Sequence, residues 1–234
     1  MDAQTALLGL LWYAVFLVSL VCHEAAHGLT GLRLGDPTAK SAGLVTLDPI
    51  PHMRRNVVGT IVVPVVSYIL GGWIMGWAST PYDSQWADRY PKRSALMSLA
   101  GPLTNLALAL LAAVTIHALY RTGTFYPPDT IDFSHVTAAT DEGAFASLST
   151  VLSIAFTLNL ILFVFNLLPL PGFDGGTVLG LLLFREDARK VLRFMANPTF
   201  FFFSIMVAWV AFDYVFGPVQ LRAVNLLYPG VTYH

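Results

Sequence analysis

Hydrophobic residues gather into five long runs along this chain, separated by short polar connections. The runs are Ala6–Gly31, Val57–Thr80, Ser94–Tyr120, Ala144–Leu168 and Phe200–Gly217. Each is close to the roughly 20 residues that a helix needs to cross the hydrocarbon core of a bilayer. The pattern predicts an all-α integral membrane protein in which four of the runs are spanning helices.

The second run, 57–80, differs from the other four. It contains Gly59, Pro64 and the pair Gly71-Gly72, all of which interrupt a straight helix. Irregular backbone is tolerated at membrane depth where it lines a cavity or is buried in protein. We therefore predict a re-entrant or broken segment at 57–80. A short stretch before it, "GLVTL" at 43–47, has the composition of a β-strand.

The composition agrees with a membrane location and excludes other classes of protein. Hydrophobic residues make up 56% of the chain and charged residues only 12%, against roughly a quarter charged in soluble domains. A net charge of −1 argues against a nucleic-acid partner. The only cysteine, Cys22, excludes an internal disulfide. Because the polar connections are shorter than a domain of about 50 residues, we expect 1–234 to form one membrane-embedded domain.

The first run carries three ionisable residues in "VCHEAAHG", at 21–28. His23, Glu24 and His27 form the pattern H-E-x-x-H, which on a helix places both imidazoles on one face with the carboxylate beside them. Zinc accepts neutral histidine nitrogens, and catalytic zinc sites use three protein ligands and leave a position for water. A carboxylate can accept a proton from that water as it attacks a peptide carbonyl. The pattern therefore indicates peptide hydrolysis.

A third ligand is available in "FNLLPLPGFDGG", at 165–176. Asp174 follows the fourth run, after Pro169 and Pro171 break the helix and before Gly175-Gly176 lets the backbone turn. Taken alone, Asp174 is equally well explained as the N-cap of a helix that leaves the membrane. Together with the two histidines, the interpretation as a metal ligand is favoured.

The H-E-x-x-H motif on one membrane helix, "AGPLTN" on a later one and "NLLPLPGFDGG" closing another resemble the site-2 protease family of intramembrane zinc metalloproteases. The lack of an inserted accessory domain resembles its compact prokaryotic branch. The resemblance covers nearly the whole chain and implies one Zn²⁺ ion per chain. It implies that His23, His27 and Asp174 are the metal ligands. It also implies that Glu24 is the catalytic base and that Asn166 lies near the substrate carbonyl.

Two other features of these motifs bear on the site. Within "AGPLTN", we interpret Gly101-Pro102 as a place of close helix packing, and Asn105 is able to hydrogen-bond toward the site, with its role left open. After "TLDP", relatives often read a His-Ile-Asp-Pro-like string where this chain has His52-Met53-Arg54-Arg55. That departure leaves the loop without an assigned role.

The two halves of the site must lie on the same side of the membrane. His27 lies near the end of the first run and Asp174 just beyond the fourth, so three crossings between them would leave the ligands on opposite faces. With 57–80 re-entrant, the ligands meet. All Lys and Arg residues except Arg121 and Arg222 then lie on one side, which the positive-inside rule makes the cytoplasmic side.

These features predict an intramembrane zinc metalloendopeptidase that cleaves membrane proteins in or near their transmembrane segments, in a prokaryotic cell membrane. The expected partners are the lipid bilayer, single-pass membrane proteins or signal-peptide-like substrates, and a separate accessory protein. One alternative is a membrane metal transporter, which would need ionisable residues on several spans. The other is a catalytically inactive scaffold homologue, which would not need Glu24 beside both histidines.

Overall fold

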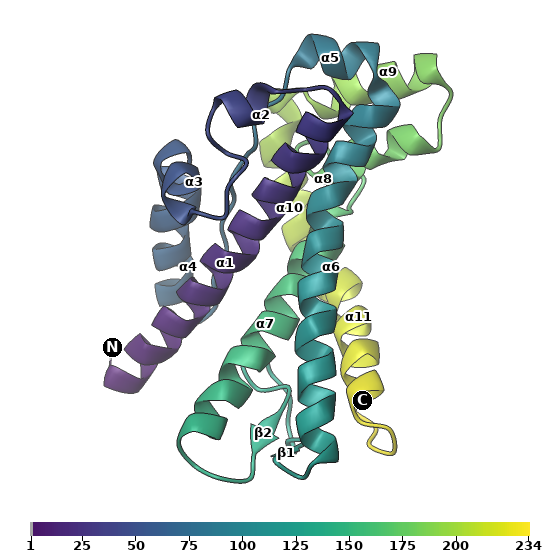
Figure 1. Cartoon of the computed structure of the whole chain (residues 1–234). Coiled ribbons are helices and arrows are strands. Elements are labelled where there is room, and N and C mark those ends of the chain that lie inside the picture. The colour runs from purple at the N-terminus through teal and green to yellow at the C-terminus, as the bar shows by residue number, and fades with distance from the viewer. Residues whose placement is uncertain (1) are drawn as a thin grey trace.

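A computed structural model describes residues 2–234 as a bundle of helices (Figure 1). Within those residues, three helices are long and apolar enough to cross a membrane: α1 (Ala3–Leu34), α6 (Pro91–Arg121) and α7 (Ala144–Asn166). Helix α6 packs against both α1 and α7. Helix α1 starts where the Asp2 side chain accepts a hydrogen bond from the Thr5 N–H at 2.7 Å, and it ends at Gly35 in the left-handed conformation.

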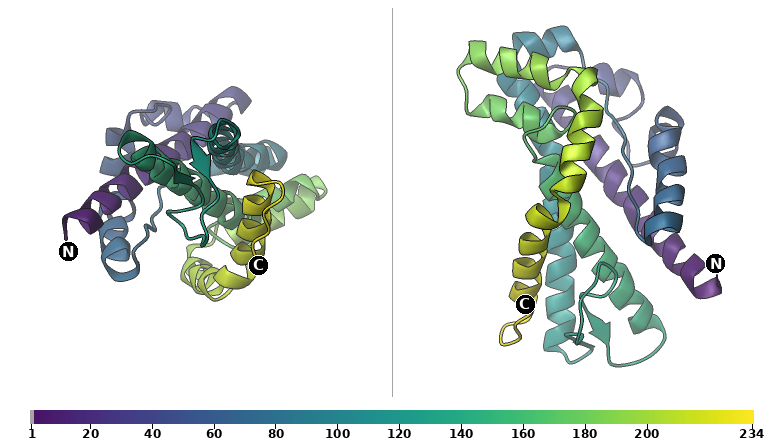
Figure 2. Two further views of the ribbon diagram at one scale, coloured as in Figure 1. Left: turned by 90° about the horizontal axis from the view of Figure 1, so that it is seen from below. Right: turned by 180° about the vertical axis from the view of Figure 1, so that it is seen from behind.

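The predicted break in the second run is present, and the segment folds back on itself. It consists of α3 (Pro49–Arg55), a π-helical stretch (Val58–Val62) and α4 (Val63–Gly71), with a 111° bend between Pro49–Arg55 and Val58–Gly71. After Gly72, whose φ is 73°, the chain returns alongside α4 as an extended segment (Figures 1 and 2). A hydrogen bond joins the two halves of the segment: the Trp77 N–H donates to the Gly59 carbonyl at 3.0 Å.

The two ends of this re-entrant segment meet. The Ser79 hydroxyl donates to the Asn56 side-chain oxygen at 3.2 Å, so the point where the segment enters the bundle lies beside the point where it leaves. A segment whose ends touch does not connect opposite faces of the bundle.

The strand expected at Gly43–Leu47 is not formed. These residues bend around the end of α2 (Thr38–Ser41), and the Leu44 N–H donates to the Ala39 carbonyl. A strand needs a neighbouring backbone for its hydrogen bonds, whereas the N–H groups of Gly43 and Leu44 donate within local turns, to the carbonyls of Lys40 and Ala39. The short strands β1 (Phe125–Tyr126) and β2 (Ala138–Ala139) pair antiparallel at the opposite end of the bundle (Figure 1).

The fifth run is longer and more bent than the sequence indicated. It forms α10 (Phe201–Val210) and α11 (Phe212–Leu227), with a 55° bend between Phe201–Val210 and Tyr214–Leu227. No Pro or Gly lies at the bend. Aromatic packing accompanies it: Trp209 stacks on Trp73 of the re-entrant segment and Phe212 stacks on Phe165 of α7. By length and composition alone, the described residues therefore offer three to five candidate spans, the higher number counting each bent pair as one span.

The remaining short helices gather at the end of the bundle where α1 finishes and α6 begins (Figure 1). They are α5 (Ser84–Arg89), α8 (Asp174–Val178), a 3₁₀ turn (Leu179–Leu181), α9 (Arg185–Met195) and a second 3₁₀ turn (Pro198–Phe200). Three arginines spaced four residues apart on α9 donate hydrogen bonds to the end of α5. Arg185 and Arg189 donate to the carbonyls of Arg89 and Asp88, and Arg193 binds the Asp88 carboxylate.

Candidate metal centre

The three expected metal ligands converge at one point. His23 and His27 are buried on one face of α1, and Asp174 reaches them from the first turn of α8. The Asp174 Oδ2 atom lies 3.2 Å from His23 Nε2 and 3.3 Å from His27 Nε2, and the two Nε2 atoms are 2.9 Å apart. Asp174 is the first helical residue of α8, and the N-cap position belongs to Phe173, so the alternative of Asp174 as a simple N-cap is not supported.

The other nitrogen of each imidazole faces an oxygen acceptor. His27 Nδ1 lies 2.8 Å from the Met97 carbonyl oxygen, and His23 Nδ1 lies 2.6 Å from the Asn105 Oδ1 atom. Both Nδ1 atoms are therefore the protonated ones in a neutral ring, and both Nε2 atoms carry lone pairs. Two lone pairs and a carboxylate that face each other within 3.3 Å repel unless a cation lies between them.

The separations fit zinc. Ligand distances of about 2.0–2.1 Å in tetrahedral geometry place ligand atoms roughly 3.3 Å apart, close to the spacings found here. The donor set of two imidazoles and one carboxylate is also one that zinc accepts in catalytic sites. The centre therefore suits a zinc ion held by three residues.

Close approach of α6 to the two histidines depends on Gly101. A Cβ atom on Gly101 would lie 2.5 Å from His23 Nε2 and would also collide with His27 Nε2. Close helix packing, which the sequence predicts at Gly101-Pro102, is therefore present at Gly101. The missing side chain leaves room for the two imidazoles and for an ion that they bind. Met97 and Asn105, four residues to either side of Gly101, supply the two Nδ1 acceptors from the same helix.

Asp174 is positioned by a tight loop. The backbone between α7 and α8 turns at Gly172, whose φ is 85°, and folds back onto the end of α7. A Cβ atom on Gly175 would collide with the main chain of Leu167 and Leu168. The glycines around Asp174 let the carboxylate return to α1 over a short distance.

Glu24 is buried beside the two histidines, and its partner comes from the re-entrant segment. The Thr80 hydroxyl lies 2.7 Å from Glu24 Oε2 and 2.9 Å from the Glu24 main-chain carbonyl. Sequence reasoning missed Thr80. The count of membrane crossings could have indicated it, because a segment that re-enters must bring its last residues back to the side of the membrane on which it entered.

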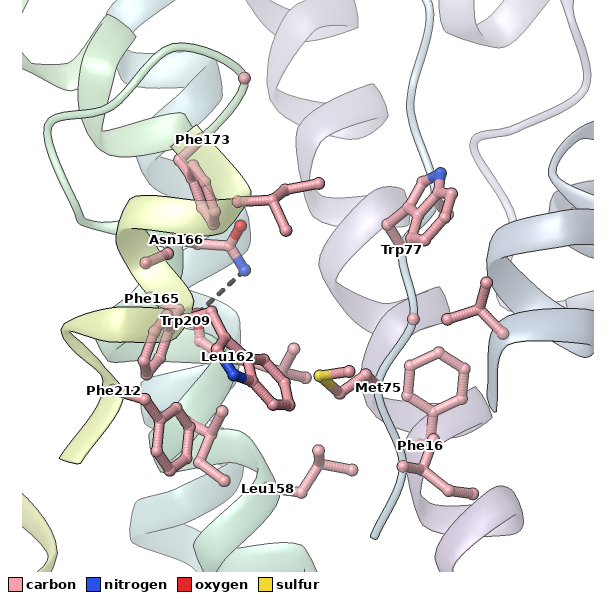
Figure 3. A pocket seen from close by; sticks show the side chains of 18 of the residues that line it. Phe16, Met75, Trp77, Leu158, Leu162, Phe165, Asn166, Phe173, Trp209 and Phe212 are labelled. Carbon is pink, nitrogen blue, oxygen red and sulfur yellow. Dashed lines mark hydrogen bonds between the residues drawn. The ribbon is translucent and has the colours of Figure 1, made fainter. Parts of the chain in front are cut away.

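Asn166 lies in the wall of a cavity of about 510 Å³ (Figure 3), whose lining includes none of the three ligands but does include Phe173, the residue before Asp174. The cavity lies between α1, the extended half of the re-entrant segment, α7 and α10. Its lining is mainly apolar and includes Phe16, Met75, Trp77, Leu162 and Trp209. Asn166 donates one N–H to the Leu162 carbonyl at 2.9 Å. An amide has a second N–H, which remains for a group in the cavity.

His52, whose role the sequence left open, is buried on α3 rather than at the metal centre. Its Nε2 atom lies 3.1 Å from the Thr46 carbonyl oxygen. This contact braces the bend that replaces the expected strand.

Fold and site together define a class: multi-pass membrane proteins with an H-E-x-x-H metal centre between helices. Residues 12–211 match the model of Peptidase family M50. The chain belongs to Peptidase family M50, the site-2 protease family that its motifs resemble.

Two relatives in sequence carry related names. The chain is 34% identical over 160 residues to "Putative zinc metalloprotease YwhC" of Bacillus subtilis, an alignment covering 68% of this chain and 63% of that protein. It is 31% identical over 206 residues to "Putative zinc metalloprotease Rip2" of Mycobacterium tuberculosis, covering 88% and 70%. The match to YwhC thus spans less than two thirds of that protein. No solved structure matches this chain.

Proposed function

We propose that this protein is an intramembrane zinc metalloendopeptidase. His23, His27 and Asp174 hold one zinc ion, and the protein hydrolyses peptide bonds in or near transmembrane segments of other membrane proteins. The observation that carries the proposal is the meeting of three ligand atoms within 4.8 Å of one another, beside a buried glutamate. Membership of Peptidase family M50 supports the same class of chemistry.

The residues around the metal have separate roles in this mechanism. When bound, zinc acts as a Lewis acid that polarises the scissile carbonyl and acidifies water. Glu24 accepts the proton of the attacking water and delivers it to the leaving amine. Thr80 holds the Glu24 carboxylate in place through its hydroxyl. Asn166 uses its second N–H to stabilise the oxyanion that forms on the substrate carbonyl.

The cavity beside the metal centre is suited to an apolar segment that has lost its helical hydrogen bonds. A helix hides its carbonyls in internal hydrogen bonds, so a substrate must unwind before it is cleaved. The Met75 and Trp77 N–H groups donate to Ser67 and Gly59. Gly76 lies between these two residues. Because successive N–H groups of an extended chain face opposite ways, the Gly76 N–H points away from α4. An unwound substrate can pair with that edge by strand addition.

The substrates we propose are single-pass membrane proteins and signal-peptide-like segments. The basic residues support an active site that opens toward the cytoplasm of a prokaryotic cell, because α9, at the metal-centre end of the bundle, carries four of them and α5 beside it carries Arg89. A partner that selects substrates would be a separate accessory protein.

The alternatives are less consistent with the structure. Transport needs ionisable groups along a route across the membrane, whereas the buried ones found here gather near one end of α1. A scaffold without catalysis leaves the contact between Thr80 and Glu24 unexplained.

The test is to measure bound zinc and cleavage of a model transmembrane peptide for the wild type and Glu24→Gln. The amide cannot accept a proton, so Glu24→Gln should keep zinc and lose hydrolysis. A Glu24→Gln protein that retains turnover within tenfold of the wild type would exclude Glu24 as the base. A wild-type protein that binds no zinc would exclude the proposed function.

A further inference from the structure

A chain of hydrogen bonds leads from the metal centre across three helices. His23 Nδ1 lies 2.6 Å from Asn105 Oδ1 on α6, and Asn105 Nδ2 donates to Asn159 Oδ1 on α7 at 2.9 Å. Asn159 Nδ2 donates to Ser19 Oγ, back on α1, at 2.9 Å and to the Ala155 main-chain carbonyl at 2.8 Å. His23, Asn105, Asn159 and Ser19 are all buried. The chain therefore starts and ends on α1, one helical turn apart.

The direction of this chain is determined by the Ala155 carbonyl. A carbonyl oxygen only accepts hydrogen bonds, so Asn159 must turn its NH₂ group toward Ala155 and its oxygen toward Asn105. Asn105 must then turn its NH₂ group toward Asn159 and its oxygen toward His23. Because that oxygen accepts, His23 carries its proton on Nδ1 and its lone pair on Nε2.

We propose that Asn105 and Asn159 are positioning residues that hold His23 in its metal-binding tautomer by transmitting the polarity of the Ala155 carbonyl. This inference rests on the proposed zinc centre. His27 needs no such relay, because its Nδ1 atom faces the Met97 main-chain carbonyl directly. A backbone carbonyl fixes the tautomer of each histidine, once directly and once through two side-chain amides.

The first test replaces Asn159, the amide that donates to the Ala155 carbonyl. Leucine has a side-chain volume similar to that of asparagine but cannot hydrogen-bond to Asn105. In Asn159→Leu the Asn105 amide can therefore turn either way, and His23 Nδ1 no longer always faces an oxygen acceptor. Loss of such outer partners costs roughly 10-fold to 100-fold in metal affinity. We expect zinc affinity, measured by competition with a chelator in detergent, to fall by that factor. Thr157→Val is the matched control, because Thr157 is buried on the same helix and its hydroxyl has no hydrogen-bond partner within residues 2–234.

The second test separates polarity from packing and from charge. Both oxygens of a carboxylate accept, so Asn105→Asp offers His23 an acceptor whichever way it turns. In the wild-type background the new carboxylate would face the Asn159 oxygen, and we expect no gain in zinc affinity. In the Asn159→Leu background that opposing oxygen is gone, and we expect Asn105→Asp to restore the affinity lost.

The outcomes distinguish the relay from the proposed function. If Asn105→Asp changes zinc affinity by the same factor in both backgrounds, the two amides are not coupled and the relay is excluded. The relay is also excluded if Asn159→Leu binds zinc as the wild type does. Should Asn159→Leu fail to fold, Asn105→Asp alone decides, because a tenfold tighter zinc affinity would show a pure charge effect. A wild type without zinc would exclude the proposed centre instead.

Discussion

The hydroxyl of Thr80 lies 2.7 Å from Oε2 of Glu24, although 56 residues separate the two in sequence. The re-entrant segment ends at this contact, so it supplies both a wall of the cavity and a donor to the proposed catalytic base. This relationship connects the unusual topology of 57–80 with the chemistry of the site.

Thr80→Val should impair catalysis and leave zinc in place. Valine keeps the shape of threonine and removes the donor, and a hydrogen bond to a charged group contributes about 1.5–3 kcal/mol. We expect turnover of a model transmembrane peptide to fall about 10-fold to 100-fold. Thr80→Ser keeps the hydroxyl and should stay close to the wild type. Equal activity in Thr80→Val and Thr80→Ser would show that the hydroxyl has no catalytic effect.

Gly101→Ala should abolish metal binding in a folded protein. The added methyl group would lie 2.5 Å from His23 Nε2, and a contact below 3.0 Å forces an imidazole out of place. We expect a loss of at least 100-fold in zinc affinity, with the helical circular dichroism signal retained. Gly217→Ala is the control, because a Cβ atom at Gly217 on α11 meets nothing within 4 Å. Full zinc content in Gly101→Ala would contradict the close approach described here.

Asp174 and Asn166 should separate in a pair of assays. Removing the carboxylate leaves two imidazoles, so Asp174→Ala should lose both zinc and activity. Asn166→Ala should keep zinc and lose activity by about 10²–10³, the usual effect of removing one oxyanion donor. Asp132→Ala, exposed at the other end of the bundle, serves as the control. The assignment is reversed if Asn166→Ala loses metal and Asp174→Ala keeps it.

The topology can be tested with an impermeant thiol reagent in a Cys22→Ala background. Single cysteines replacing Lys40 and Arg89, which are exposed on either side of the re-entrant segment, should both react from the cytoplasmic side. A cysteine replacing Asp141, exposed before α7, should react from the outside. Labelling of Lys40→Cys and Arg89→Cys from opposite sides would mean that 57–80 crosses the membrane.

The ion pair between α9 and α5 should stabilise the fold in a pH-dependent way. The hydrogen bond from Arg193 holds the pKa of Asp88 below its ordinary value. The stabilisation is therefore present above the unfolded pKa of about 3.9 and is lost as the pH falls through the lower folded pKa. Arg193→Gln should lower the midpoint of thermal unfolding at pH 7 in dilute buffer. The difference should shrink at 1 M salt, where the Debye length is about 3 Å, and its persistence there would contradict an electrostatic origin.

The sequence was most informative where chemistry and backbone geometry are local. H-E-x-x-H fixes two imidazoles on one helix face, and the Gly and Pro residues of 57–80 mark a break that any fold must accommodate. Asp174 was predicted as the third ligand from the helix break before it, taken together with the two histidines, and from the resemblance of the motifs. Because ligands of one metal must share a side, counting the crossings then predicted that 57–80 does not cross.

Other features depend on contacts between distant parts of the chain. The "GLVTL" composition favours a strand, but a strand requires a paired backbone, and among residues 2–234 the strands that pair are β1 and β2. The bend between α10 and α11 accompanies aromatic packing on Trp73 and Phe165 rather than any helix-breaking residue. The acceptor of Asn105 lies on α7, 54 residues further along the chain, and no spacing rule links the two.

The metal ligands come from distant parts of the chain, and this has a consequence for biosynthesis. His27 and Asp174 are 147 residues apart in the sequence, so at about 5–20 residues per second Asp174 leaves the ribosome roughly 7–30 seconds after His27. Throughout that interval the nascent chain holds both histidines without the carboxylate of Asp174. The order of the three residues along the chain thus delays assembly of the proposed metal centre until α7 has been inserted and the loop after it has closed on α1.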